Sequence, residues 1–178
     1  FSNIHYSKST DAGETWSEAM QINEVSGNCV DSDETTEGAV PTMGPNGEIY
    51  VAWSGPEGIV FDKSIDGGNT WLDEDIFINS QPGGWNYNIP GIYRANGLPI
   101  TCCDISNSPN RGTIYVNWTD QRNGEDDTDV WLAKSTDGGN TWSDAIRVND
   151  DHIDKQQFFS WMTIDQKTGE LLFVFYDR

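Results

Sequence analysis

The sequence has 178 residues, of which 29 are acidic and 10 are basic, and its formal charge at pH 7 is −19. Such a surface repels nucleic acid and anionic lipid, because phosphate binding relies on lysine and arginine. Hydrophobic residues form 35% of the chain and include eight tryptophans, which excludes a disordered acidic tail. No apolar run approaches the ~20 residues of a membrane-spanning helix, so we expect no membrane insertion.

The first predicted element is a hairpin. A short apolar strand, Ile4–Tyr6, precedes the octapeptide Ser9–Trp16, and an alternating strand follows at Ala19–Ile22. The octapeptide reads Ser-x-Asp-x-Gly-x-Thr-Trp. Its Ser and Asp oxygens can accept hydrogen bonds from nearby backbone N–H groups, and its Gly tolerates a positive φ. Its Trp covers the turn with apolar surface. We therefore predict that the octapeptide closes a turn and is not a catalytic triad.

The octapeptide recurs twice, each time inside a set of four predicted strands. The first set has its strands at 39–43, 47–53, 59–61 and 75–78. The second set has its strands at 99–103, 112–118, 130–132 and 145–148. Two more strands follow, at 159–164 and 169–175. The structural positions of the three octapeptides are Ser9, Asp11, Gly13, Trp16, Ser64, Asp66, Gly68, Trp71, Ser135, Asp137, Gly139 and Trp142.

A four-stranded antiparallel unit that repeats along a chain is typical of a β-propeller blade. Repeated octapeptides of this form on such units resemble the Asp-box repeats of the sialidase, or neuraminidase, superfamily. The resemblance implies an all-β propeller, commonly six-bladed, with its site at the top near the axis and the Asp-boxes on the lower rim. We expect a single partial propeller over residues 1–178, of about three blades. Its parts are a half blade (1–25, strands C and D), two full blades (38–80 and 98–150) and a half blade (158–178, strands A and B). The remaining blades would come from the rest of a parent propeller or from a second copy.

The resemblance also places the long loops opposite the Asp-boxes on the upper face. Aromatic rings stack on sugars and arginine binds carboxylates in a bidentate manner. The predicted substrate-binding residues are Trp85, Tyr93, Arg94, Asp120 and Arg122. The alternative is that these aromatic side chains simply pack on the top of the propeller.

Two acidic loops carry the oxygen ligands that Ca²⁺ prefers. The predicted metal ligands are Asp31, Asp33, Glu34 and Glu37 in one loop, and Asp126, Asp127 and Asp129 in the other. Neither loop has the EF-hand pattern, and solvated acidic loops are the alternative in a chain this charged.

The three cysteines leave two alternatives open. In a secreted protein, Cys29 would pair with one of the adjacent residues Cys102 and Cys103, and we take Cys29–Cys103 as the predicted disulfide. Three free, buried thiols are the other interpretation.

Function is predicted at the level of class. We expect a secreted or cell-surface protein, extracellular or periplasmic, whose upper face interacts with a glycan or glycoprotein. One alternative is a non-catalytic adhesion or structural module with Ca²⁺-loaded loops. The other is an active exo-sialidase or related glycoside hydrolase with its catalytic residues mostly outside these 178 residues. Sialidases use three arginines, a Tyr–Glu pair and an Asp acid/base, and no such set can be assigned here, so the catalytic residues stay unknown.

Overall fold

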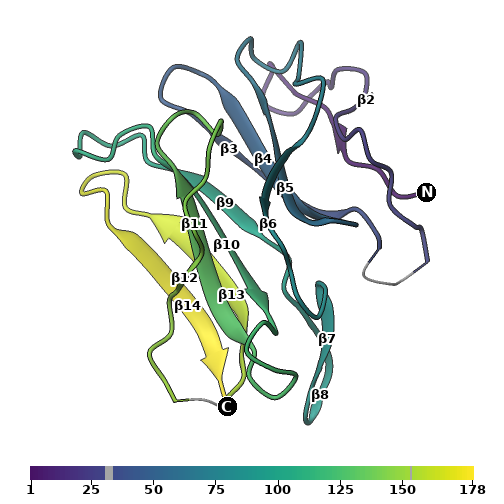
Figure 1. The fold of residues 1–178 in the computed structure, drawn as a ribbon. Helices are drawn as coiled ribbons and strands as arrows, with labels where there is room; N and C mark the ends of the chain where they lie inside the picture. Colours follow the sequence, from purple (N-terminus) through teal and green to yellow (C-terminus); the bar gives the residue numbers. More distant parts are fainter. Residues whose placement is uncertain (31–33, 153) are drawn as a thin grey trace.

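The computed structural model describes residues 1–30, 34–152 and 154–178, and within these ranges the fold is all-β. It contains two four-stranded and three two-stranded sheets, and all pairings between its strands are antiparallel. The sheets follow one another across the molecule from β1 to β14, without closing into a ring in the described part of the chain (Figure 1). None of the described residues belongs to a helix that could span a membrane.

Each four-stranded sheet is a simple meander in which every strand pairs with its neighbours in the sequence. The first sheet consists of β3 (Glu37–Met43), β4 (Ile49–Gly55), β5 (Gly58–Ser64) and β6 (Ile76–Asn79). The second consists of β9 (Ile100–Cys103), β10 (Ile114–Asp120), β11 (Asp129–Ser135) and β12 (Ile146–Arg147). The strands predicted at 47–53 and 112–118 are thus observed as the central strands β4 and β10. Both are buried along their whole length, because each is paired on two edges and covered on two faces.

Three hairpins complete the fold. They are β1 (His5–Tyr6) with β2 (Met20–Gln21), β7 (Asn86–Ile89) with β8 (Ile92–Asn96), and β13 (Gln157–Ile164) with β14 (Leu171–Asp177). The pair β7–β8 lies in the connection between the two four-stranded sheets, where the sequence predicted a long loop rather than strands. Gly91, at a φ of 78°, supports the tight turn between them.

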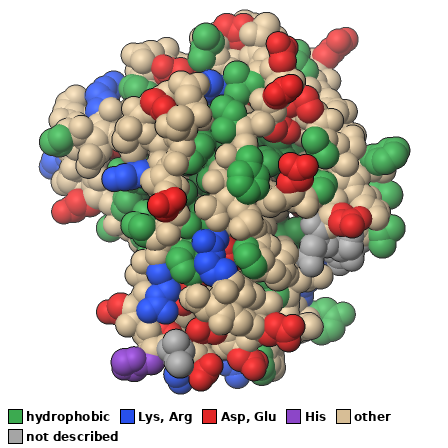
Figure 2. Space-filling view, in the orientation of Figure 1, with side chains coloured by type: hydrophobic (Ala, Val, Ile, Leu, Met, Phe, Trp, Pro, Cys, Tyr) green, Lys and Arg blue, Asp and Glu red, His purple; other side chains and the backbone are tan. Residues whose placement is uncertain are grey.

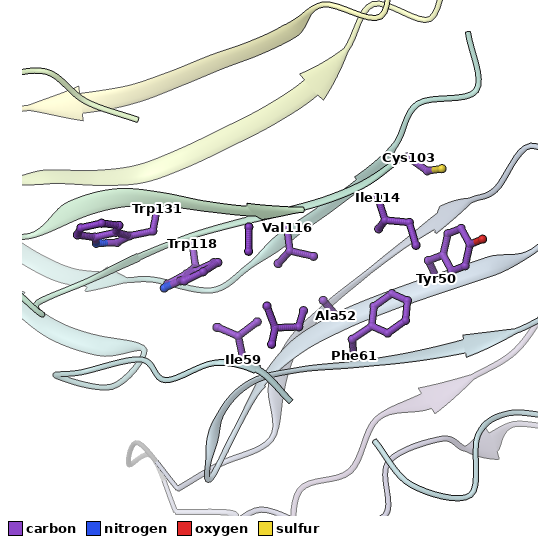
Figure 3. Close-up of a cluster of buried hydrophobic side chains, with 11 residues drawn as sticks. Tyr50, Ala52, Ile59, Phe61, Cys103, Ile114, Val116, Trp118 and Trp131 are labelled. Atoms are coloured by element: carbon purple, nitrogen blue, oxygen red, sulfur yellow. The ribbon is translucent and has the colours of Figure 1, made fainter. Parts of the chain in front are cut away.

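A continuous apolar core joins the two four-stranded sheets (Figure 3). One sheet contributes Tyr50, Ala52, Ile59 and Phe61, and the other contributes Ile114, Val116, Trp118 and Trp131. These residues alternate along their strands, because successive side chains of a strand point to opposite faces of the sheet. The opposite faces form two further cores, one against β1–β2 and the other against β13–β14. The molecule is therefore a series of stacked sheets.

Each octapeptide closes a hairpin with the same four hydrogen bonds. In the second copy, the Ser64 hydroxyl donates to Asp66 Oδ1 (2.8 Å), and the backbone N–H of Gly68 donates to Ser64 Oγ (2.8 Å). The Thr70 N–H and hydroxyl donate to the two oxygens of Asp66, at 2.9 and 2.7 Å. The other two copies have the corresponding bonds. The octapeptides thus build turns, and their polar atoms are used inside those turns.

The same hydrogen bonds keep the octapeptide carboxylates ionised. The Thr15 hydroxyl and N–H lower the pKa of Asp11 to about 2, and Thr141 lowers the pKa of Asp137 to about 2 in the same way. The backbone N–H of Thr70, followed by its hydroxyl, lowers the pKa of Asp66. Donors aimed at a carboxylate stabilise its charged form.

The predicted disulfide is wrong, because all three cysteines are free. Cys103 is buried in the core between the four-stranded sheets, whereas its neighbour Cys102 points to the other face of β9 and contacts the backbone of Met162. Cys29 is exposed, beside Asn28 in the segment between β2 and β3. The alternative of three buried thiols is also only partly right, since Cys29 is at the surface.

Candidate functional site

The main candidate site is a groove at the end of the sheets opposite the octapeptide turns. It has a volume of about 590 Å³ and lies between β7 and the segment that follows β10. The hairpin β7–β8, whose first strand lines this groove, lies near the lower end of the molecule in Figure 1. We call this site the polar groove, and its lining residues are Gly83, Asn86, Tyr87, Asn88, Ile89, Pro90, Gln121, Glu125 and Asp126.

The wall of the groove formed by β7 is held in place by contacts with β10 and with the residue that follows β14. The Tyr87 side chain is buried, and its hydroxyl is hydrogen-bonded to the Thr119 hydroxyl. Burial raises the pKa of Tyr87, so this phenol stays protonated at any physiological pH. At the tip of the hairpin, the Arg178 guanidinium donates to the Pro90 carbonyl over 2.8 Å. The hairpin is thereby tied both to β10 and to the end of β14.

The opposite wall is held by the Gln121 side chain. Its amide nitrogen donates to the Glu125 carbonyl (2.9 Å) and to the Thr128 hydroxyl (3.2 Å), which closes the loop between β10 and β11. The carboxylates of Glu125 and Asp126 belong to exposed residues on this loop. The groove therefore combines amide and carboxylate side chains with a few apolar surfaces from β7 and Pro90.

Asp120 and Arg122, two of the predicted substrate-binding residues, are paired with each other. Arg122 Nη2 lies 2.6 Å from Asp120 Oδ2, and the same oxygen accepts a hydrogen bond of 2.7 Å from the indole of Trp118. The guanidinium also lies 4.2 Å from the ring centroid of Trp131. Asp120 is fully buried. These contacts give the pair a structural role at the end of β10 and β11, next to the polar groove.

The remaining predicted substrate-binding residues are Trp85, Tyr93 and Arg94, and they differ in their burial. Trp85 is buried and its indole N–H donates to the Thr35 hydroxyl over 2.9 Å, so the ring belongs to the interior. The Arg94 guanidinium lies 5.8 Å from the centroid of the Trp85 ring. Tyr93 projects fully into solvent. The structure therefore brings Trp85 and Arg94 together and leaves Tyr93 apart from them.

Those predicted calcium ligands that the structure describes do not gather into a site. Asp31 and Asp33 lie outside the described residues, while Glu34 is exposed in the turn before β3 and Glu37 begins that strand. Asp126 is exposed in the polar groove, and its neighbour Asp127 is buried with one oxygen unpartnered. Within the described ranges, no three His, Cys, Asp or Glu side chains are grouped so that they could hold a metal ion.

Asp129, the last predicted calcium ligand, is buried in a polar network. It accepts hydrogen bonds of 2.6 Å from both Asn123 and Asn149, and its other contact is the Arg147 guanidinium at 3.4 Å. Asn149 also contacts Gln157 of β13. A buried charge must be paired with donors, and Asp129 satisfies this requirement with protein groups.

The sequence missed a carboxyl cluster between the first hairpin and the first four-stranded sheet. The backbone N–H of Glu24 donates to Asp75 Oδ2 (3.4 Å), and buried oxygens of Asp62 and Asp75 have no hydrogen-bond partner. Burial, followed by the charge of Glu24, raises the pKa of Asp75 to about 7. Burial also raises the pKa of Asp62 to about 6. Nothing in the sequence indicates this cluster, because Glu24 comes from a different repeat than Asp62 and Asp75.

Glu24 and Asp75 of this cluster line a pocket of about 320 Å³, together with Trp53 and Phe77. The Asp75 carboxylate accepts its hydrogen bond from the Glu24 backbone N–H. The cluster therefore fits a pH-sensitive contact between the first hairpin and the first four-stranded sheet.

No protein-family model matches the chain, and a search of curated proteins gave no match.

Proposed function

We propose that this chain forms part of a sialidase-like Asp-box β-propeller, secreted or displayed at a cell surface, that binds glycans through the polar groove. The propeller is supported by the two four-stranded meanders, each with an octapeptide between its third and fourth strands. It is also supported by the stacking of successive sheets through buried cores. In this proposal the groove lies on the top face and the octapeptides on the lower rim.

The lining of the groove is the observation that carries the glycan proposal. The exposed Asn88 presents an amide group, which both donates and accepts hydrogen bonds, as sugar hydroxyls do. The exposed Pro90 adds apolar surface for the C–H faces of a sugar ring. A volume of about 590 Å³ lies within the ~300–1,000 Å³ of small-molecule sites.

Charge favours a neutral glycan over a sialylated one. Glu125 and Asp126 would repel a carboxylate in the groove, and the chain as a whole carries a formal charge of −19. Of the nearby cations, Arg122 is neutralised by Asp120, and the Arg178 guanidinium donates to the Pro90 carbonyl. Acidic side chains are also scattered over the face seen in Figure 2, and apolar side chains are exposed between them. The proposed relation to sialidases therefore concerns the fold, and the ligand class is different.

Isothermal titration calorimetry with a neutral β-linked tetrasaccharide and with a sialylated trisaccharide tests this proposal. We expect the neutral sugar to bind and the sialylated one to bind at least ~10-fold more weakly, since ~1.4 kcal/mol corresponds to a factor of ten. Asn88→Ala, in the groove, should weaken binding. Asn107→Ala is the matched control, because Asn107 is an exposed asparagine in the turn between β9 and β10. Failure of a broad glycan array to bind the chain, or equal effects of both substitutions, would overturn the proposal.

A further inference from the structure

The second four-stranded sheet carries a cation at its boundary with the first. The Arg122 guanidinium lies 4.2 Å from the ring centroid of Trp131 and 5.7 Å from that of Trp118. Its Nη2 also donates to Asn79 Oδ1 over 3.0 Å, at the end of β6 in the preceding sheet. Aromatic faces attract a guanidinium, and the oxygen acceptor fixes its position. This boundary is therefore built around a bound cationic side chain.

The strand register locates the equivalent place in the first four-stranded sheet. The cross-strand pair Trp118–Trp131 lies four pairs from the octapeptide serine of its sheet, as does the pair Trp53–Val60. Each of these pairs faces the sheet that precedes its own. The pocket of about 320 Å³ is lined by Trp53 and Val60. It is therefore the counterpart of the place that Arg122 fills.

This pocket is open because the connection between β4 and β5 is short. Only Pro56 and Glu57 lie between the two strands. The corresponding connection of the second sheet runs over residues 121–128 and supplies Arg122. The guanidinium is thus provided by its own sheet, and the acceptor Asn79 belongs to the last strand of the preceding one. The pocket results from the length of a loop inside the sequence.

The lining of the pocket is acidic, and we call it the acidic pocket after its carboxylates, which are those of Glu24, Glu57, Glu74 and Asp75. Among the described residues, no lysine or arginine lines it. Asp75 Oδ1 is buried and has no hydrogen-bond partner in the described part of the chain. A buried carboxylate oxygen is stable only when a donor or a positive charge lies next to it. A cationic ligand supplies both.

A second carboxylate contributes to this charge. Asp62 is fully buried, its Oδ2 has no partner among the described groups, and its charge acts on Asp75. By strand register, the equivalent positions of the second sheet are Ala133 and Ala145, which pack in the apolar core. The fold therefore does not require acids at these positions. Two aspartates occur at the boundary that lacks an arginine of its own.

The remaining lining suits an organic cation. Phe77 is 52% exposed, so its ring is accessible to a ligand. Val25 and Pro56 are also exposed and add apolar surface for an alkyl chain. The volume lies within the ~300–1,000 Å³ of small-molecule sites. No three acidic, histidine or cysteine side chains in the described ranges are grouped for a metal ion, which favours an organic cation over a metal.

We propose that the acidic pocket binds a guanidinium group on an alkyl chain, as in an arginine side chain or a related small molecule. The ligand occupies the place that corresponds to Arg122 in the second sheet. Its N–H groups donate to the Asp75 carboxylate, since the planar guanidinium matches a carboxylate in a bidentate manner. This inference is independent of glycan binding, because the acidic pocket and the polar groove share no lining residue.

Isothermal titration calorimetry at pH 8 with N-acetyl-argininamide and N-acetyl-citrullinamide tests the proposal. Citrulline has nearly the same shape but carries a neutral urea, so we expect it to bind at least ~10-fold more weakly. The lysine analogue should also bind more weakly, because an ammonium lacks the planar fork. Preference for the amide over free arginine would indicate a polypeptide ligand, and the reverse preference a free small molecule. Both results support a guanidinium site.

A matched pair of variants assigns the binding to the pocket. Asp75→Asn should weaken binding of N-acetyl-argininamide at least ~10-fold, whereas Asp73→Asn makes the same charge change at an exposed neighbour and should leave it unchanged. Circular dichroism checks that both variants fold. No binding at about 1 mM, equal binding of the citrulline or lysine analogue, or equal effects of the two substitutions would overturn the proposal. Glycan binding should be unaffected by Asp75→Asn, so the two proposals can fail separately.

Discussion

Lys63 and Asn140 lie 77 residues apart in the sequence, and their side chains are joined by a hydrogen bond of 2.6 Å that links the two four-stranded sheets. The same ammonium group donates to the Gly138 carbonyl. The ammonium group of Lys63 thus links one four-stranded sheet to the octapeptide turn of the next.

We expect Lys63→Met to lower the free energy of unfolding by about 1 kcal/mol, because the apolar stem is kept while two charge-assisted hydrogen bonds are lost. Urea denaturation measures this difference. Lys155→Met, at an exposed lysine, is the control and should change stability by less than ~0.5 kcal/mol. Equal effects of the two substitutions would show that the contact between sheets contributes nothing.

The raised pKa of Asp75 predicts an unusual pH dependence of the free energy of unfolding. Its pKa is raised to about 7 in the folded protein from an ordinary value of 3.8. The folded state therefore holds more protons than the unfolded state between these values, so this contribution to stability is full below pH 3.8 and is lost as the pH rises through 7.

Asp75→Asn keeps the shape and removes the titration. It should stabilise the protein at pH 8 by on the order of 1–2 kcal/mol, with the advantage vanishing near pH 4. Thermal unfolding across this pH range is the measurement. Asp73→Asn, an exposed neighbour, should show no such trend. An Asp75→Asn variant that is less stable than the parent at pH 8 would contradict the assignment.

Arg122→Ala should be among the most destabilising changes near the polar groove. It leaves the fully buried Asp120 without its cationic partner and uncovers the ring of Trp131. Breaking a buried pair by removing one member costs about 3 kcal/mol. The double variant Asp120→Asn/Arg122→Met should lose less, because no unpaired charge remains. Chemical denaturation of both variants tests this, and a milder effect of Arg122→Ala alone would be contrary evidence.

Alanine substitutions at Gly13 and Gly68, which occupy equivalent octapeptide positions, distinguish the cost of backbone strain from that of a steric clash. Gly68 and Gly13 have φ of 84° and 91°, so alanine costs roughly 1–2 kcal/mol at either position. Only at Gly68 would the new Cβ meet an aromatic ring, that of Tyr6 at 2.5 Å. Gly68→Ala should therefore cost a further ~1–3 kcal/mol. Similar losses for the two variants in urea denaturation would argue against the packing of Tyr6 on this turn.

The three thiols should differ sharply in reactivity. Burial raises the pKa of Cys102 to about 11 and that of Cys103 to about 12, whereas Cys29 is exposed. Thiolate is the reactive form, so Ellman's reagent should label Cys29 in the native protein and the other two only after unfolding. Cys29→Ser should abolish the native signal. A reductant should leave the melting temperature unchanged, and a large decrease would indicate a disulfide.

The polar groove shows how much of a site can be predicted from local sequence. Trp85, Arg94, Asp120 and Arg122 were identified as polar or aromatic residues in loops, and they do lie around the hairpin β7–β8 and the end of β10. Their orientation was not predictable, because it depends on partners far along the chain, such as Thr35 for Trp85 and Asn79 for Arg122. The groove residues Asn86, Asn88 and Glu125 carry no motif that would identify them.

The sequence by itself determined the octapeptide turns and the strands of the two four-stranded sheets, but not the strands β7 and β8. The Ser, Asp, Gly and Thr of each octapeptide satisfy one another within eight residues, and apolar alternation defines β4 and β10, so local chemistry was sufficient. Tertiary structure alone decided that Lys63 reaches the next octapeptide, that Cys29 and Cys103 stay apart, and that Glu24 meets Asp75. These contacts depend on how one sheet stacks on the next, and that stacking is set by cores assembled from several strands.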